Sequence, residues 1–151
     1  MKDFNIILDS LDTTSWIGSN IYDANYYVNF GTLIEDEDYK KRFKITLRLK
    51  STLDADILST ENYICNLIVN SKVYCQQNLG ISYTLGILNK YTADSNTGNF
   101  ALDCSPNDNP PIVIHTLDRM SSIRLQLNIL ETGALFVGMP LYIAILNFEQ
   151  M

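Results

Sequence analysis

His115 has the widest chemical repertoire of any residue in this chain, because it is the single histidine and imidazole titrates near neutral pH. Nucleophilic catalysis by a serine or cysteine would need this side chain as its base, and no Gly-x-Ser-x-Gly elbow lies nearby. A metal site on a β-rich fold would need further His or Glu ligands from neighbouring strands, and there is no second histidine. We therefore interpret His115 as a hydrogen-bonded or exposed residue at the end of a strand. The sequence predicts no catalytic residue, no metal ligand set and no cofactor-binding site.

The three cysteines, Cys65, Cys75 and Cys104, are too far apart in the chain to form a CxxC metal motif. Cys65 has apolar alternate neighbours and is expected in the core as a small apolar residue. Cys75 and Cys104 are expected in loops, and whether they pair is left open. The odd number of cysteines and the lack of an Asn-x-Ser/Thr sequon favour folding in the reducing cell interior over secretion.

Carboxylates that stand close together in the sequence are the remaining candidates for chemistry. Glycoside hydrolysis needs two carboxylates that meet at roughly 5 to 9.5 Å, which the sequence alone does not decide. Asp54 and Asp56 form one pair, and Asp103 and Asp108 form another. Both pairs fall in expected loops, so we interpret them as solvated turn residues, with Ca²⁺ binding as the minor alternative. The chain is expected not to be an enzyme.

The composition indicates one globular domain spanning residues 1–151. Hydrophobic residues make up 46% of the chain, which excludes disorder, and the net charge of −6 argues against general nucleic-acid binding. The most apolar stretch, Ala134–Leu146, is interrupted by Gly138 and Pro140 and is too short for a membrane span. The apolar run near Met1 is too short for a secretion signal, so we expect neither secretion nor a membrane span.

Period-two alternation of apolar and polar residues dominates the sequence and predicts strands. In Arg42–Lys50, Phe43, Ile45, Leu47 and Leu49 point to one face and the basic residues to the other. The same alternation returns in Ile123–Ile129, and seven further segments are rich in β-branched and aromatic residues: Phe4–Leu8, Tyr22–Phe30, Tyr63–Val69, Ile81–Leu88, Asn99–Leu102, Pro111–His115 and Leu141–Phe148. We predict an all-β fold, an antiparallel β-sandwich in the form of a single jelly roll with about eight or nine strands.

The segment after the basic strand has two interpretations. Ser51 to Asp54 has the spacing of a helix cap and predicts a short helix through Thr60. A plain loop is the equal alternative.

Charge is distributed unevenly, and this marks a candidate partner-docking surface. The acidic run Glu35–Asp38 precedes six of the eleven basic residues: Lys40, Lys41, Arg42, Lys44, Arg48 and Lys50. One interpretation is a solvated outer sheet face that resists edge pairing, and the alternative is a docking surface for an acidic neighbour. Because adjacent strand residues point in opposite directions, Tyr26 and Tyr27 do not both face the core, so one of them is expected at a surface. The candidate docking residues are Arg42, Lys44, Arg48, Lys50, Tyr26 and Tyr27.

The layout resembles the single-jelly-roll minor capsid proteins of large icosahedral DNA viruses. The segments that carry the resemblance are Ala24–Phe30, the acidic turn, Arg42–Leu49, Asn109–Ile114, Ile123–Leu127 and the closing strand Leu141–Phe148. The resemblance covers nearly the whole chain as a pattern of strands and spacing, without a diagnostic motif.

This resemblance implies a structural protein of the virion that cements or bridges neighbouring capsid proteins, namely the major capsid protein and other minor capsid proteins. Self-association into a homo-oligomer is left open. The alternative expectation is a jelly-roll binding module that recognises carbohydrate or a receptor, including a trimeric form. Fold alone does not decide between them.

Overall fold

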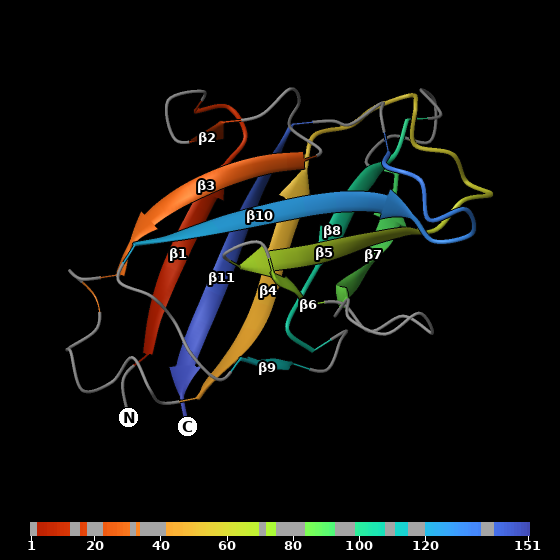
Figure 1. Ribbon diagram of the computed structural model, residues 1–151. Coiled ribbons are helices and arrows are strands. Elements are labelled where there is room, and N and C mark those ends of the chain that lie inside the picture. Colours follow the sequence, from red (N-terminus) through yellow and green to blue (C-terminus); the bar gives the residue numbers. More distant parts are fainter. Residues whose placement is uncertain are drawn as a thin grey trace.

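The computed structural model describes residues 3–12, 16–17, 23–30, 33, 42–69, 72–74, 84–92, 99–107, 111–114, 120–136 and 141–151 (Figure 1). Within these ranges the chain forms strands and no α-helix. The strands are β1 (Asp3–Asp9), β2 (Trp16–Ile17), β3 (Asp23–Asn29), β4 (Phe43–Ser51), β5 (Tyr63–Val69), β6 (Lys72–Tyr74), β7 (Thr84–Tyr91), β8 (Ala101–Cys104), β9 (Ile112–Ile114), β10 (Met120–Ile129) and β11 (Tyr142–Gln150).

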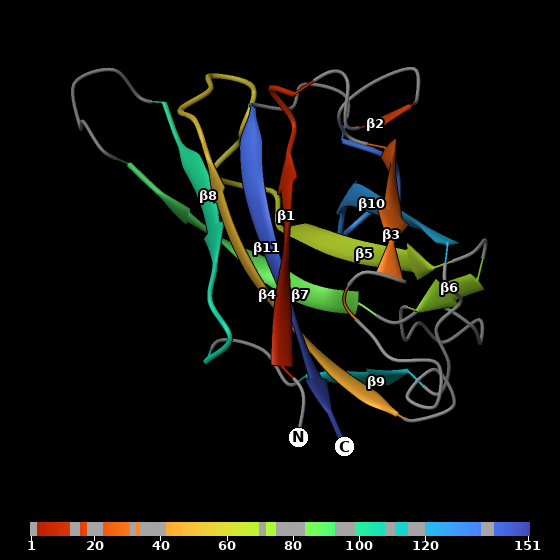
Figure 2. The ribbon, with the colours of Figure 1, turned by 90° about the vertical axis from the view of Figure 1, so that its left-hand side faces the viewer.

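The strands form two antiparallel layers that face each other, as Figure 2 shows. The first sheet has the order β1-β11-β4-β8, with β9 continuing beside β4, and the second has the order β2-β3-β10-β5-β7, with β6 continuing beside β5. The end of β7 also pairs with β8 and joins the two sheets. If the eight principal strands are numbered along the chain, the sheets have the orders 1-8-3-6 and 2-7-4-5. This is the pairing of a jelly roll, so the predicted fold class is confirmed.

The core lies between the sheets and is filled by alternate residues of each strand. Phe43, Ile45, Leu47 and Leu49 of β4 are at most 2% exposed. On β10, Ile123, Leu125 and Leu127 are fully buried. The alternation predicted for both strands is confirmed, because period-two burial is what a strand with one covered face requires.

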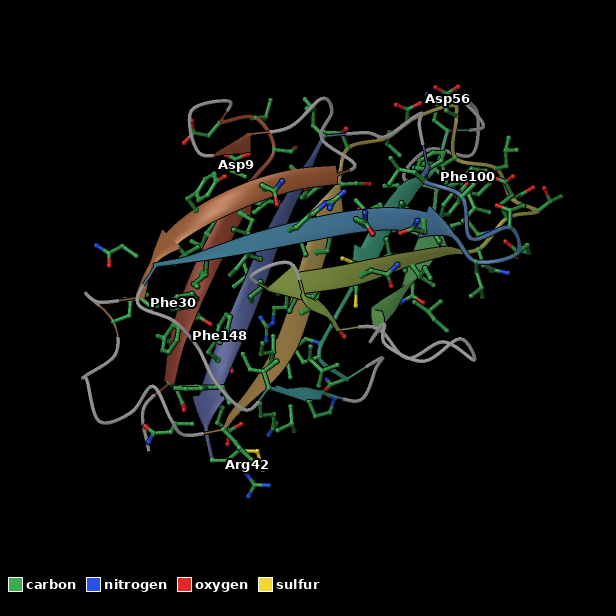
Figure 3. All side chains as sticks on the ribbon, in the orientation of Figure 1. Asp9, Phe30, Arg42, Asp56, Phe100 and Phe148 are labelled. Atoms are coloured by element: carbon green, nitrogen blue, oxygen red, sulfur yellow. The ribbon has the colours of Figure 1, made fainter. Side chains whose placement is uncertain are left out.

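Aromatic rings close one end of the core. Phe4 and Phe148 are register partners on β1 and β11, and their rings stack with centroids 5.0 Å apart. Phe30 meets both rings edge-on, at 5.9 Å and 5.7 Å, and Figure 3 shows Phe30 beside Phe148. Since edge-to-face and offset-stacked rings attract beyond their buried area, this cluster fixes how the sheets meet at that end.

A buried hydrogen bond connects the sheets further along the sandwich. The hydroxyl groups of Tyr26 on β3 and Tyr142 on β11 lie 3.0 Å apart. The backbone N–H of Tyr142 donates to Oγ of the buried Ser10 at 2.7 Å. Burial raises the pKa of both tyrosines, so the two phenols are neutral donors and acceptors at neutral pH.

The helix predicted after the basic strand is wrong, and the loop alternative holds. Ser51 ends β4, and its hydroxyl accepts the N–H of Leu102 at 2.7 Å instead of capping a helix. Asp54 accepts the N–H of Asp56 in a tight local turn and pairs through its backbone with Phe100. Tertiary partners thus satisfy the groups that a helix cap would have used.

Several strand boundaries also differ from those predicted. Strands β7 and β8 end three and two residues later than predicted, because the last residues of β7 pair with β8 and the last residues of β8 pair with β4. Cys104 therefore lies in a strand, not a loop, and is buried. Cys75 and residues 81–83 fall outside the described residues. The short strands β2 and β6 were not predicted, since two or three residues carry no readable periodicity.

We predict that Leu47→Ala lowers the free energy of unfolding by about 2 to 5 kcal/mol, because it opens a cavity in the middle of the core. Thr46→Ala changes the adjacent residue, which points away from the core, and should lower the free energy of unfolding by less than about 1 kcal/mol. Urea denaturation of both variants measures the difference. Equal losses would contradict the assignment of inner and outer faces.

Tyr63 provides a second test of the core. Burial raises its pKa to about 12, while an unfolded tyrosine titrates near 10. Below pH about 10 the phenol is neutral in both states; above it the unfolded state loses its proton first, so the free energy of unfolding falls towards pH about 12. Urea denaturation at pH about 9 and about 11.5 should show a smaller fall for Tyr63→Phe than for the unchanged chain. Tyr27→Phe, which removes an exposed phenol, is the control and should show the same decrease in the free energy of unfolding as the unchanged chain. An equal decrease in the Tyr63→Phe and Tyr27→Phe variants would show that Tyr63 does not cause the effect.

Candidate protein-binding face

The four predicted basic docking residues lie together on the side of the first sheet that faces away from the core. Arg42 precedes β4, and Lys44, Arg48 and Lys50 are outward residues of that strand. Figure 3 shows Arg42 at the end of the sandwich near the chain termini. Lys44 is half-buried, and the other three are exposed.

Residues of β1, β11 and β4 that are register partners project to the same side of the sheet and form rows across it. We call these twelve outward residues of the three strands the outer face. Its rows, each running from β1 through β11 to β4, are Asp9–Ile143–Lys50, Ile7–Ile145–Arg48, Asn5–Asn147–Thr46 and Asp3–Glu149–Lys44. The outer face therefore has an acidic edge along β1, isoleucines at one end of β11 and a basic line along β4.

Two rows are tied by hydrogen bonds within the molecule, and two are not. Nζ of Lys44 donates to Oε2 of Glu149 at 2.7 Å, and the side-chain amide of Asn147 donates to Oδ1 of Asn5 at 3.0 Å. The side chains of Arg48 and Lys50 have no hydrogen bond or ion pair with any other residue that the structure describes, although Asp103 is the register neighbour of Lys50. Within the part of the chain that the structure describes, nothing therefore occupies these two cationic groups.

Apolar side chains are exposed between these charges. Ile7 is 66% exposed and Ile143 is 46% exposed, while Ile145 is half-buried between them. Exposed isoleucines side by side on a sheet form the kind of apolar patch that marks a protein interface. The sequence carries part of this signal, because Tyr142–Gln150 has apolar residues at consecutive positions, which a strand with one solvated face would not need. It does not show which of the two faces is exposed.

A concavity of about 450 Å³ lies beside the patch, lined by Arg48, Leu49, Lys50, Asp103, Cys104, Ser105, Ile143 and Ile145. It adjoins a second one of about 390 Å³ that shares Arg48 and Ile145 and reaches Pro106. Among the described residues, β8 pairs with β4 at Leu49 and Lys50 alone, and the strand ends at Cys104. Figure 2 shows β8 and the following segment standing to the left of β4, on the side away from the second sheet. This segment forms a wall along the outer face.

The two predicted tyrosines do not join the basic residues. Tyr26 is 2% exposed and bonded to Tyr142, so its assignment as a docking residue is wrong: the alternation of β3 turns it into the core. Tyr27 is 61% exposed, as the opposite parity requires. It lines an open concavity of about 380 Å³ between β1 and β3, next to Ile7 and Leu33 and away from β4.

The other candidates for chemistry gain no support. Burial raises the pKa of the Cys65 thiol, which keeps it protonated and unreactive. His115 and Asp108 lie outside the described residues, and Asp103 stands beside Lys50 on the sheet. Among the described residues no three His, Cys, Asp or Glu side chains gather in a way that would hold a metal ion. No helix in the described parts of the chain has the length and apolarity to cross a membrane.

Comparison of the chain with protein-family models, curated proteins and solved structures finds no match. The geometry of the outer face is therefore the observation from which function has to be argued.

We predict that Arg48→Glu and Lys50→Glu together leave the fold intact, because exposed charges contribute only about 0 to 1 kcal/mol each. Circular dichroism and urea denaturation should show an unchanged strand spectrum and a free energy of unfolding within about 2 kcal/mol of the unchanged chain. Loss of cooperative unfolding would show that these cations hold the sheet together and are not available to a partner.

Proposed function

We propose that this protein is a structural component of a viral capsid that holds neighbouring capsid proteins together, and that it is not an enzyme. The observation that carries the proposal is the outer face, where exposed isoleucines adjoin two cations whose side chains pair with none of the described residues. Association of proteins is driven by burying such apolar surface, and complementary charges set orientation and rate. The resemblance of the strand pattern to single-jelly-roll minor capsid proteins supports the viral setting.

The partners proposed are the major capsid protein and other minor capsid proteins, within a virion assembled from proteins that fold inside the host cell. An acidic patch on the neighbour would complement Arg48 and Lys50. The neighbour would cover Ile7 and Ile143, which a protein working alone in water would not need to expose.

A carbohydrate-binding or receptor-binding jelly roll is the alternative, and its support is weaker. A sugar platform needs flat aromatic rings at the surface. Of the described side chains Tyr27 is the aromatic one that is more than half exposed, and it stands beside aliphatic and amide groups. Selective binding on a glycan array would favour this alternative and contradict the structural proposal.

Pull-down of the protein after co-expression with the shell proteins of the same virus tests the proposal. We expect the Arg48→Glu, Lys50→Glu variant to lose shell proteins, and the unchanged chain to lose them as salt rises above roughly 0.15 M. The variant Arg48→Lys, Lys50→Arg, which keeps both charges, is the matched control and should bind normally. Normal incorporation of the charge-reversed variant at low and high salt would show that the outer face is merely solvated.

A further inference from the structure

We propose that the outer face binds a second copy of this chain, face to face, about a two-fold axis parallel to β11. The inference deepens the proposed function and rests on it for the choice of face: the neighbour that covers Ile7 and Ile143 is a second copy of this chain, and the other capsid proteins bind the resulting pair.

A two-fold axis can lie in the interface in two principal directions. An axis across the strands would place β4 against β4 of the second copy, so the basic line would meet itself. An axis along the strands places β4 against β1 of the second copy and β11 against its own counterpart. Like charges facing each other cost several kcal/mol, so electrostatics select the axis along the strands.

With this axis each row meets the same row in reverse order. Asp9 faces Lys50 of the second copy, and Lys50 faces the other copy's Asp9, because both residues flank Ile143 in one row. At the other end of the sheet Asp3 faces Lys44 of the second copy in both directions. Glu149 of the same row meets its own counterpart at the axis, and each of these carboxylates keeps its ion pair with Lys44 of its own chain at 2.7 Å, so this is one like-charge contact against four contacts of opposite charge. A row that carries opposite charges at its two ends is self-complementary, as a two-fold interface requires.

The apolar residues also find partners under this symmetry. Ile143 and Ile145 lie on β11 and meet their own counterparts near the axis. Ile7 faces the Arg48 position of the second copy, where the concavities of about 450 Å³ and 390 Å³ meet. Its exposed side chain would fill apolar space between Arg48 and Ile145. Aligned sheets pack about 10 Å apart, which is the thickness that interleaved isoleucines fill.

The wall after β8 fits this arrangement. Strand β1 is the edge of the first sheet, with β11 as its one partner in the described part of the chain. Seated over β4 of the other copy, this edge strand would lie beside the segment Asp103–Pro106, which stands up from the outer face. A broader sheet would collide with the wall, whereas an edge strand stops short of it.

Pairing of the two β1 edges is the competing mode, and its charges oppose it. Antiparallel pairing centred on Ile6 would set Asp3 of each copy against Asp9 of the other. Two carboxylates directly opposite on a sheet destabilise the pairing. Acidic residues near both ends of an edge strand are a common protection against such association, so the face and not the edge is the site.

Sedimentation equilibrium of the purified full chain tests the inference through a charge swap. We expect the unchanged protein to be a dimer, and Asp9→Lys and Lys50→Asp each to raise the dissociation constant at least about tenfold. The double variant Asp9→Lys, Lys50→Asp restores opposite charges across the axis and should bring the constant back towards that of the unchanged chain. Asp56→Lys makes the same change in charge as Asp9→Lys, in a loop that lies well away from Asp9 in Figure 3. This control should leave the dissociation constant of the dimer unchanged.

Several outcomes would overturn the inference. These are a monomer at every concentration, a dimer that neither single variant weakens, a double variant that fails to recover, or an equal loss with Asp56→Lys. Because Asp9 also accepts the N–H of Leu11, Lys50→Asp serves as the variant that leaves this turn untouched. If the protein is a monomer and still enters particles, the dimer is wrong and the capsid role stands. If it is a dimer and is absent from particles, the capsid role is wrong and the dimer stands.

Discussion

The pairing of β11 with both β1 and β4 is the constraint on which the rest of the structure depends. The strand nearest the end of the chain lies between the strand nearest its beginning and the basic strand, in unbroken register over seven and nine residue pairs. This pairing stacks Phe4 on Phe148 and brings Tyr142 to the hydroxyl of Tyr26. Contacts between such distant parts of a chain require closure of a long loop, which makes folds of this kind slow to form.

The same pairing makes the outer face. The inward residues of β11 fill the core. Its outward residues lie between the outward residues of β1 on one side and those of β4 on the other. A chain with a net charge of −6 thereby gains a sheet face on which three bases line β4, two acids lie on the opposite strand β1, and a third acid, Glu149, lies on β11 between them. The charges that looked like a lone basic strand in the sequence are one half of a self-complementary pattern.

Local periodicity made much of the fold predictable. The alternation in Arg42–Lys50 and Ile123–Ile129 needs only neighbours along the chain, and both strands and their inner faces are confirmed. The failed helix at Ser51 has the opposite cause. Its capping groups are taken by Leu102 and Phe100, which are about fifty residues away and carry no local signal.

The candidate site was predictable only in part, because a surface depends on register. The basic residues of β4 were found from their spacing, and the parity of β3 showed that Tyr26 and Tyr27 must separate without showing which one is buried. Ile143 and Ile7 were missed as surface residues, since each stands among apolar neighbours that do enter the core. Their exposure follows from which strands lie beside them, and sequence periodicity does not contain that information.

Two copies that meet through the outer face with β11 on the axis can be detected by a cross-link at Asn147. Asn147 would face its own counterpart, so Asn147→Cys should join two chains through a short bis-maleimide in high yield. Leu58→Cys, exposed in the loop after β4, is the control, with Cys75→Ser in both variants. We expect fast cross-linking of Asn147→Cys and little cross-linking of Leu58→Cys. Equally slow cross-linking at both positions would show that two copies do not meet through the outer face.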